Sequence, residues 1–188
     1  TLTNSEGVKQ TQAAVKAGTP MLRTLVQMDE PEHMKFRALT QAWFMPQNIK
    51  KLEARIRELA RDAVNRMEAL GGECDFVNEV ALHYPLRVIM EILGVPHEDE
   101  PRMLKLTQEL FGAADPDLQR KSEAQTEAER LAEVQQVIAD FFGYFHAITE
   151  SRRAAPVGDV ASVIANATVD GQPITPFDAI SYYVIIAT

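Results

Sequence analysis

Two side chains four residues apart, His33 and Arg37, are the strongest candidates for binding chemistry in this sequence. Residues at this spacing lie on the same side of an α-helix, so both side chains would point in one direction. Arginine binds carboxylates through a planar fork of N–H donors, and histidine offers a further nitrogen donor. The pair therefore predicts a contact with an anion such as a carboxylate. The alternative is a pair of solvated residues on a helix surface, which is a common arrangement.

The helix that must carry this pair has a recognisable beginning and an apolar side. Asp29 is predicted to cap it, with Glu32 completing a capping box three residues later, and Pro31 suits the first turn. Thr40 and Phe44 continue the stripe of the pair itself, and a second, apolar stripe runs beside it. These apolar neighbours favour a half-buried anion over a fully solvated pair. The residues of the apolar stripe are Phe36, Leu39 and Trp43.

The remaining reactive side chains do not indicate a second site. His83, His97 and His146 lie on separate predicted elements, and none has an acidic or histidine neighbour at the spacing of metal ligands. Cys74 follows two glycines and a glutamate, a context that does not activate a thiolate. The sequence has no nucleophile elbow, P-loop or glycine-rich dinucleotide motif. The residues alone thus predict a helical domain that binds an apolar ligand with carboxylates.

Composition excludes several classes of protein. The chain has 188 residues, of which 46% are hydrophobic and 24% charged, as in an ordinary globular protein. Its net charge of -8 argues against non-specific binding of nucleic acid. No apolar run approaches the roughly 20 residues that span a bilayer, so no membrane association is expected. The single cysteine excludes an internal disulfide framework, which makes a reducing cytoplasm the expected compartment.

Apolar spacing predicts a mainly α-helical fold with at least seven helices, one or two short hairpins and no extended sheet. A short strand is predicted at Glu73–Val77, a tight turn at Asp170-Gly171 and a capped helix start at Thr175. The final run, Tyr182–Thr188, is apolar and lacks a stop signal. It predicts that the chain is a segment of a longer protein, cut inside a buried helix. The main helices are expected at about residues 29–45, 47–70, 83–93, 98–112 and 126–153.

The order of these motifs resembles that of soluble, bacterial-type cytochrome P450 enzymes. Met28–His33 with Arg37, followed by Phe44-Met45-Pro46, is similar to the C-helix region of that family, although Glu30 replaces the usual second proline. The resemblance spans nearly the whole chain, from the B–C region to the start of the I helix. It is closest to the terpene-hydroxylating (alpha-terpineol) branch. Further matching segments are Gly72–Val77, Ile92–Pro96 and Tyr182–Thr188.

The resemblance implies a partial cytochrome P450 fold, with residues 1–188 as a single partial domain from the N-terminal and middle portion of the catalytic domain. His33 and Arg37 would then hold the propionates of haem b. Phe111, Ile185 and Thr188 would line the substrate pocket. The cysteine that ligates iron and the oxygen-activating motif would lie outside this segment, so it contains no catalytic residue of its own.

The activity implied by the resemblance is that of a haem-thiolate monooxygenase. The parent protein would hydroxylate a small apolar substrate, terpenoid or aromatic, with O2 and with electrons from a ferredoxin-type partner. The alternative is a non-enzymatic helical domain that binds a ligand or acts as a sensor.

Overall fold

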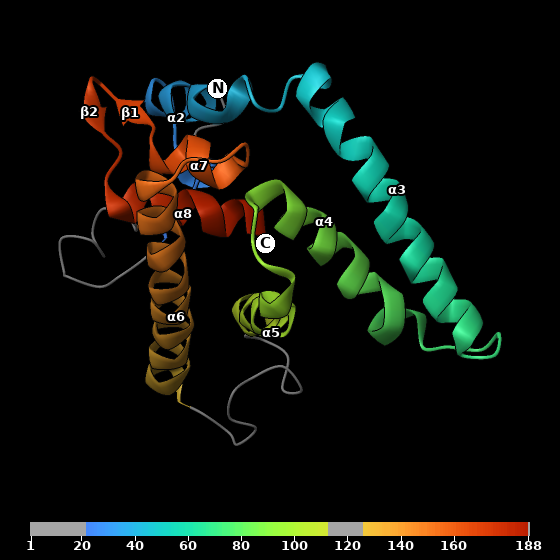
Figure 1. The fold of residues 1–188 in the computed structure, drawn as a ribbon. Coiled ribbons are helices and arrows are strands. Elements are labelled where there is room, and N and C mark those ends of the chain that lie inside the picture. Colours follow the sequence, from blue (N-terminus) through green and yellow to red (C-terminus); the bar gives the residue numbers. More distant parts are fainter. Residues whose placement is uncertain (1–21, 113–125, 188) are drawn as a thin grey trace.

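The computed structural model describes residues 22–112 and 126–187, and these residues form a predominantly helical structure (Figure 1). Seven α-helices, three short helical turns and one two-stranded hairpin follow one another in these ranges, which confirms the predicted mainly α fold. None of the described helices is long and apolar enough to cross a membrane. The elements are η1 (Leu25–Gln27), α2 (Glu32–Gln41), α3 (Pro46–Ala69), η2 (Val77–Ala81), α4 (His83–Leu93), η3 (His97–Asp99), α5 (Glu100–Phe111), α6 (Glu127–Ala154), α7 (Val160–Ala165), β1 (Thr168–Val169), β2 (Gln172–Pro173) and α8 (Pro176–Ala187).

Helix α8 lies at the centre of the packing. It crosses the upper part of α6 and packs against α6, α7 and α4 (Figure 1). Ala179, Tyr183 and Val184 on α8 are at most 1% exposed. A helix that is apolar on nearly all sides must be surrounded by protein, because any exposed side would present apolar surface to water. The predicted buried final helix is therefore confirmed for the residues that the structure describes.

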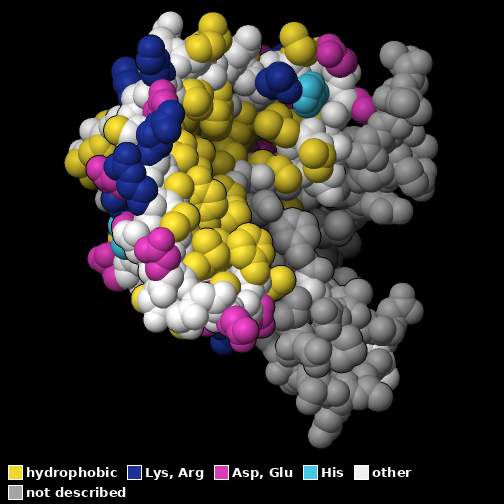
Figure 2. Space-filling view, turned by 90° about the vertical axis from the view of Figure 1, so that its right-hand side faces the viewer, with side chains coloured by type: hydrophobic (Ala, Val, Ile, Leu, Met, Phe, Trp, Pro, Cys, Tyr) yellow, Lys and Arg dark blue, Asp and Glu magenta, His cyan; other side chains and the backbone are white. Residues whose placement is uncertain are grey.

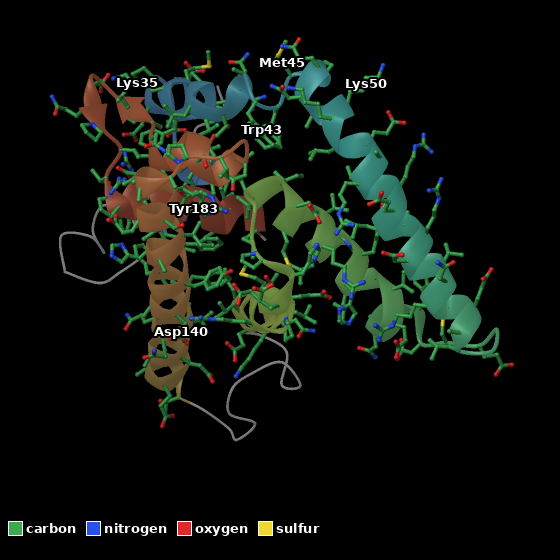
Figure 3. All side chains as sticks on the ribbon, in the orientation of Figure 1. Lys35, Trp43, Met45, Lys50, Asp140 and Tyr183 are labelled. Atoms are coloured by element: carbon green, nitrogen blue, oxygen red, sulfur yellow. The ribbon has the colours of Figure 1, made fainter. Side chains whose placement is uncertain are left out.

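Aromatic side chains fill the space between α6 and α8. The rings of Phe141 and Phe145 stack with centroids 6.2 Å apart, and the Phe145 ring lies 5.2 Å from that of Tyr183. The Tyr183 hydroxyl donates a hydrogen bond to the carbonyl of Ala161 on α7, at 3.0 Å. Burial raises the pKa of Tyr183 to about 12, so the hydroxyl keeps its proton and its role as a donor. Figure 3 shows Tyr183 inside the region where α6, α7 and α8 meet.

The beginning of α2 differs from the prediction. The helix starts at Glu32 with Pro31 as its N-cap residue, and no side chain caps it. Glu32 does not close a capping box, because its carboxylate forms an ion pair with Arg23. The predicted Asp29–Glu32 box is therefore wrong. A long-range ion pair has replaced a local one, which the spacing of residues along the chain does not reveal.

The strand predicted at Glu73–Val77 is also wrong. Residues 73–75 are irregular, and a π-helical turn, η2, follows. The carboxylate of Asp75 accepts hydrogen bonds from the backbone N–H groups of Val77 and Asn78, each at 3.1 Å. An aspartate that binds the backbone N–H groups just after it favours the start of a helical turn over a strand.

Two local signals near the C-terminal end are confirmed. Strands β1 and β2 form the expected hairpin, and Asp170 and Gly171 at its tip have φ angles of 51° and 78°. Positive φ at both central residues is what an Asp-Gly turn provides. At the start of α8, the Thr175 hydroxyl accepts a hydrogen bond from the N–H of Asp178 and donates one to its carboxylate.

Gly94 occupies a position where three helices come together. It ends α4 with a left-handed φ of 67°, and a Cβ atom built there would overlap the carboxylate of Asp159. That carboxylate caps α7 at Ser162 and is held by Arg152 of α6 at 2.7 Å. Arg152 also donates to the Gly94 carbonyl at 2.7 Å. Glycine is thus required by both the backbone angle and the lack of space.

We predict that Gly94→Ala lowers the free energy of unfolding by about 2 kcal/mol or more, because alanine adds left-handed strain to a clash with Asp159. Gly143→Ala is the matched control. Gly143 lies on the exposed side of α6 with nothing within 4 Å of an added Cβ, so alanine should stabilise that helix by about 0.5–1 kcal/mol. Thermal and denaturant unfolding of the purified protein measure both effects. Equal unfolding midpoints for the two variants would contradict this account of Gly94.

Candidate functional site

Helix α2 presents His33 and Arg37 outside its packed side. Phe36 and Thr40 are buried, whereas His33 is half-buried and Arg37 is exposed. The side chains of His33 and Arg37 have no hydrogen-bond or ion-pair partner among the residues that the structure describes. They lie one helical turn apart on the same element, as the spacing predicts. The structure therefore leaves a cation and an imidazole available to a group from outside the described residues.

The packed side of α2 is attached to α8 by Tyr182. The Tyr182 hydroxyl lies 2.7 Å from the Thr40 hydroxyl and donates to the carbonyl of Phe36 at 3.3 Å. Burial raises the pKa of Tyr182, against the opposing effects of the Thr40 hydrogen bond and the positive charge of Arg37. The hydroxyl is therefore neutral, and it can donate to Phe36 while it accepts from Thr40.

Thr40 corrects one detail of the predicted helix. It lies two helical turns after His33, as the predicted stripe requires, but it is 4% exposed and faces α8, whereas Phe44 lies beyond the end of α2. Sequence reasoning did not identify Thr40 and Tyr182 as the contact that joins α2 to α8. The available signal was a tyrosine within an otherwise apolar helix, since a buried hydroxyl needs a hydrogen-bond partner.

Beyond the end of α2, the next contact is made by Trp43. Its Nε1–H donates to the carbonyl of Gly158 at 3.0 Å, and its ring meets that of Phe44 edge to face at 5.1 Å. Figure 3 shows Trp43 below the end of α2, whereas Met45 and Lys50 lie at the outer edge of the molecule. Trp43 thus fastens the C-terminal end of α2 to the turn that precedes α7.

Of the three predicted substrate-contacting residues, one has a side chain that the structure describes. Ile185 is half-buried in the last turn of α8, three residues after Tyr182. Residues three apart are neighbours on a helix, so Ile185 lies one turn from the hydroxyl that reaches α2. Phe111 is the last residue of α5, but its side chain is outside the described part, as is all of Thr188.

Two of the other histidines lie beside carboxylates. His83 lies 2.7 Å from Glu100, and His97 lies 2.8 Å from Glu91, so tertiary structure supplies the acidic neighbours that the local sequence lacks. Burial acts to raise the pKa of Glu100, but the bonds from Arg87 and His83 outweigh it and hold that pKa below its usual range. His146 and Cys74 are exposed. Within residues 22–112 and 126–187, no group of three potential ligands could hold a metal ion.

One face of the molecule carries a band of apolar side chains. Figure 2, viewed from the side of α3, shows a band of apolar side chains with Lys and Arg along one edge. Large apolar side chains that are at least 37% exposed include those at the junction of α2 and α3 and those near η2. They are Phe44, Met45, Ile49, Phe76 and Val77. The band in Figure 2 is typical of a surface that packs against other protein, and the named side chains lie near the two ends of α3.

The sequence of this chain is similar to that of a known protein. The chain is 44% identical over 177 residues to cytochrome P450-terp of a Pseudomonas species, covering 93% of this chain and 41% of that protein. No family model matches the chain.

The fold of this chain is also similar to that of solved structures. The fold matches CYP108D1 from Novosphingobium aromaticivorans with a TM-score of 0.75 and 46% identity, covering 88% of this chain and 37% of that one. It also matches a Mycobacterium marinum cytochrome P450 in complex with pseudoionone, with a TM-score of 0.78 and 28% identity over 87% of this chain and 38% of the other. The chain spans about two fifths of the length of these three proteins. Both the sequence and the fold of this chain match those of cytochrome P450s over most of its residues. The chain therefore belongs to the bacterial-type cytochrome P450s and corresponds to a part of such a protein.

Proposed function

We propose that this chain forms part of the single catalytic domain of a haem-thiolate monooxygenase. The observation that supports the proposal most directly is the pair His33 and Arg37, which is positioned on a firmly packed helix and has no partner among the described residues. Membership in the cytochrome P450 family supplies an anion of the right kind, because haem carries two propionates. The apolar band on the side of α3 is, on this proposal, covered by the remainder of the same domain.

His33 and Arg37 would each bind a propionate of haem b. The arginine fork suits a carboxylate, and the imidazole, half-buried one turn earlier, suits a second hydrogen bond. When bound and ligated by a cysteine thiolate, haem supplies the oxygen-activating chemistry of this family. The residues of this chain contribute by holding the edge of the cofactor. Cys74 is exposed on the loop after α3, away from α2 and α8, so the iron ligand would be another cysteine.

The proposed substrate is a small apolar molecule, terpenoid or aromatic. Ile185 supports this choice, because it offers an aliphatic side chain one helical turn from the contact between α8 and α2. Phe111 and Thr188 are the other two proposed substrate contacts. The names of two similar proteins agree with such substrates: one is cytochrome P450-terp and the other binds pseudoionone. An apolar pocket with few polar groups would position the substrate mainly by shape.

The oxygen atom inserted would come from O2, with electrons from a ferredoxin-type protein in the cytoplasm. The resemblance to bacterial-type enzymes supports this donor, and the single cysteine of the chain supports this compartment. The second candidate function, a non-enzymatic helical ligand-binding or sensor domain, would use the same apolar core but would not need a carboxylate-binding pair.

The reduced, carbon monoxide-bound absorption spectrum of the full-length protein separates these two functions. We expect the band that is typical of thiolate-ligated haem, and we expect Cys74→Ser to retain it, because Cys74 is not the proposed iron ligand. A full-length protein that takes up no haem would exclude the monooxygenase. Loss of the band in Cys74→Ser alone would show that the iron ligand is wrongly assigned.

We predict that Arg37→Ala weakens haem binding by about 2 kcal/mol, because it removes a charge-assisted hydrogen bond to a propionate. The rate of haem transfer to an acceptor protein measures this effect, which corresponds to a roughly 30-fold faster loss. Arg57→Ala is the control, since Arg57 is also exposed and, in the described part of the chain, pairs with Glu53 on its own helix. Unchanged haem loss in Arg37→Ala would refute the propionate role.

A further inference from the structure

Arg23 connects three separate segments of the fold. Its guanidinium group pairs with Glu32 at the start of α2 and with Asp178 in the first turn of α8, the latter at 2.9 Å. Its backbone N–H donates to the Ser181 hydroxyl of α8 at 3.2 Å. The guanidinium also lies over the ring of Phe36, 5.5 Å from the centroid. One side chain thus contacts both helices that the proposed function places beside the haem.

The partners of Arg23 are held in place. Asp178 is 13% exposed, and its second oxygen accepts a hydrogen bond from Thr175 at 2.7 Å. Its carboxylate is therefore fixed by the capping interaction of α8 while it receives Arg23. An arginine fork can direct separate N–H groups at two carboxylates, whereas lysine offers only a compact point charge. The geometry is specific to arginine.

Together with Tyr182, Arg23 attaches α2 to α8 at both ends of the segment that holds the proposed haem contacts. Arg23 acts at Glu32, one residue before His33, and Tyr182 acts at Phe36 and Thr40, on either side of Arg37. Among the described residues, the other ion pair of α2 joins Lys35 to Asp170 of the hairpin, is largely exposed and does not involve α8. Helix α2 is therefore located relative to α8 by two buried or half-buried attachments.

We propose that Arg23 is a positioning residue that holds His33 and Arg37 in register with α8 and so sets the strength with which the cofactor is retained. This inference rests on the proposed function, because it requires that α2 binds the haem propionates. Arg23 itself need not touch the cofactor. Without its fork, the first turn of α2 would keep its packing on α7 and β1 but lose its charged link to α8, and the donors on α2 would lose their alignment with fixed carboxylates.

Haem-loss rates of the full-length protein in a double-mutant cycle test this inference. The four proteins are the wild type, Arg23→Met, Arg37→Ala and the double variant. We expect Arg23→Met to lose haem about five- to tenfold faster than the wild type. The double variant should lose haem more slowly than the product of the two single effects predicts, because the Arg37 contact through which Arg23 partly acts is already gone and only the His33 contact remains. A merely structural role would instead accelerate haem loss by the same factor in both backgrounds.

Two further variants complete the test. Arg23→Lys should restore part of the wild-type retention, and Lys35→Met, which removes the other ion pair of α2, should leave the rate unchanged. Wild-type haem loss in Arg23→Met, or independent effects in the double variant, would overturn the inference even if Arg37→Ala behaves as expected. No effect of Arg37→Ala would overturn the proposed function and this inference with it. If Arg23→Met does not fold, Asp178→Asn provides the same test, because asparagine keeps a cap for α8 but removes the charge partner.

Discussion

The rest of the structure depends on the burial of α8, and in particular on what burial requires of three consecutive hydroxyl groups. Ser181, Tyr182 and Tyr183 are each at most 4% exposed, so each must find a partner within the protein. Successive residues on a helix point about 100° apart, and the three hydroxyls accordingly reach three different elements. Ser181 accepts from the segment before η1, Tyr182 bonds to α2, and Tyr183 donates to α7. The apolar surface of α8 brings the elements together, while its hydroxyls determine which element lies on which side.

Much of the fold could be predicted from the sequence because its signals are local. The Asp-Gly turn and the Thr175 cap each depend on residues within a few positions of one another, and both are found in the structure. The errors have a common physical cause. Glu32 was available to cap its own helix, yet it pairs with Arg23, because a guanidinium held by a second carboxylate is a stronger partner than a free N–H group.

Only a part of the candidate site could be predicted from the sequence, because its other contacts join residues that are far apart in the chain. Helical spacing and residue chemistry were sufficient to single out His33 and Arg37. Their setting depends on contacts between residues more than 140 positions apart, such as Thr40 with Tyr182 and Arg23 with Asp178. No periodic pattern encodes such a pairing. A polar residue in an apolar helix indicates that a partner exists without identifying it, and only the packed structure shows which one.

The position of α3 has a consequence for how the molecule opens. This helix packs chiefly on α4 and η2, and Leu59 is its buried side chain, whereas α8 is enclosed by three helices. Its links to α4 include the ion pair of Arg55 with Glu91, which is partly exposed. The free energy that holds α3 in place within the described part of the chain is therefore much smaller than that of the central bundle. Hydrogen exchange should divide these residues into two cooperative units, with α3 opening while the bundle around α8 remains closed.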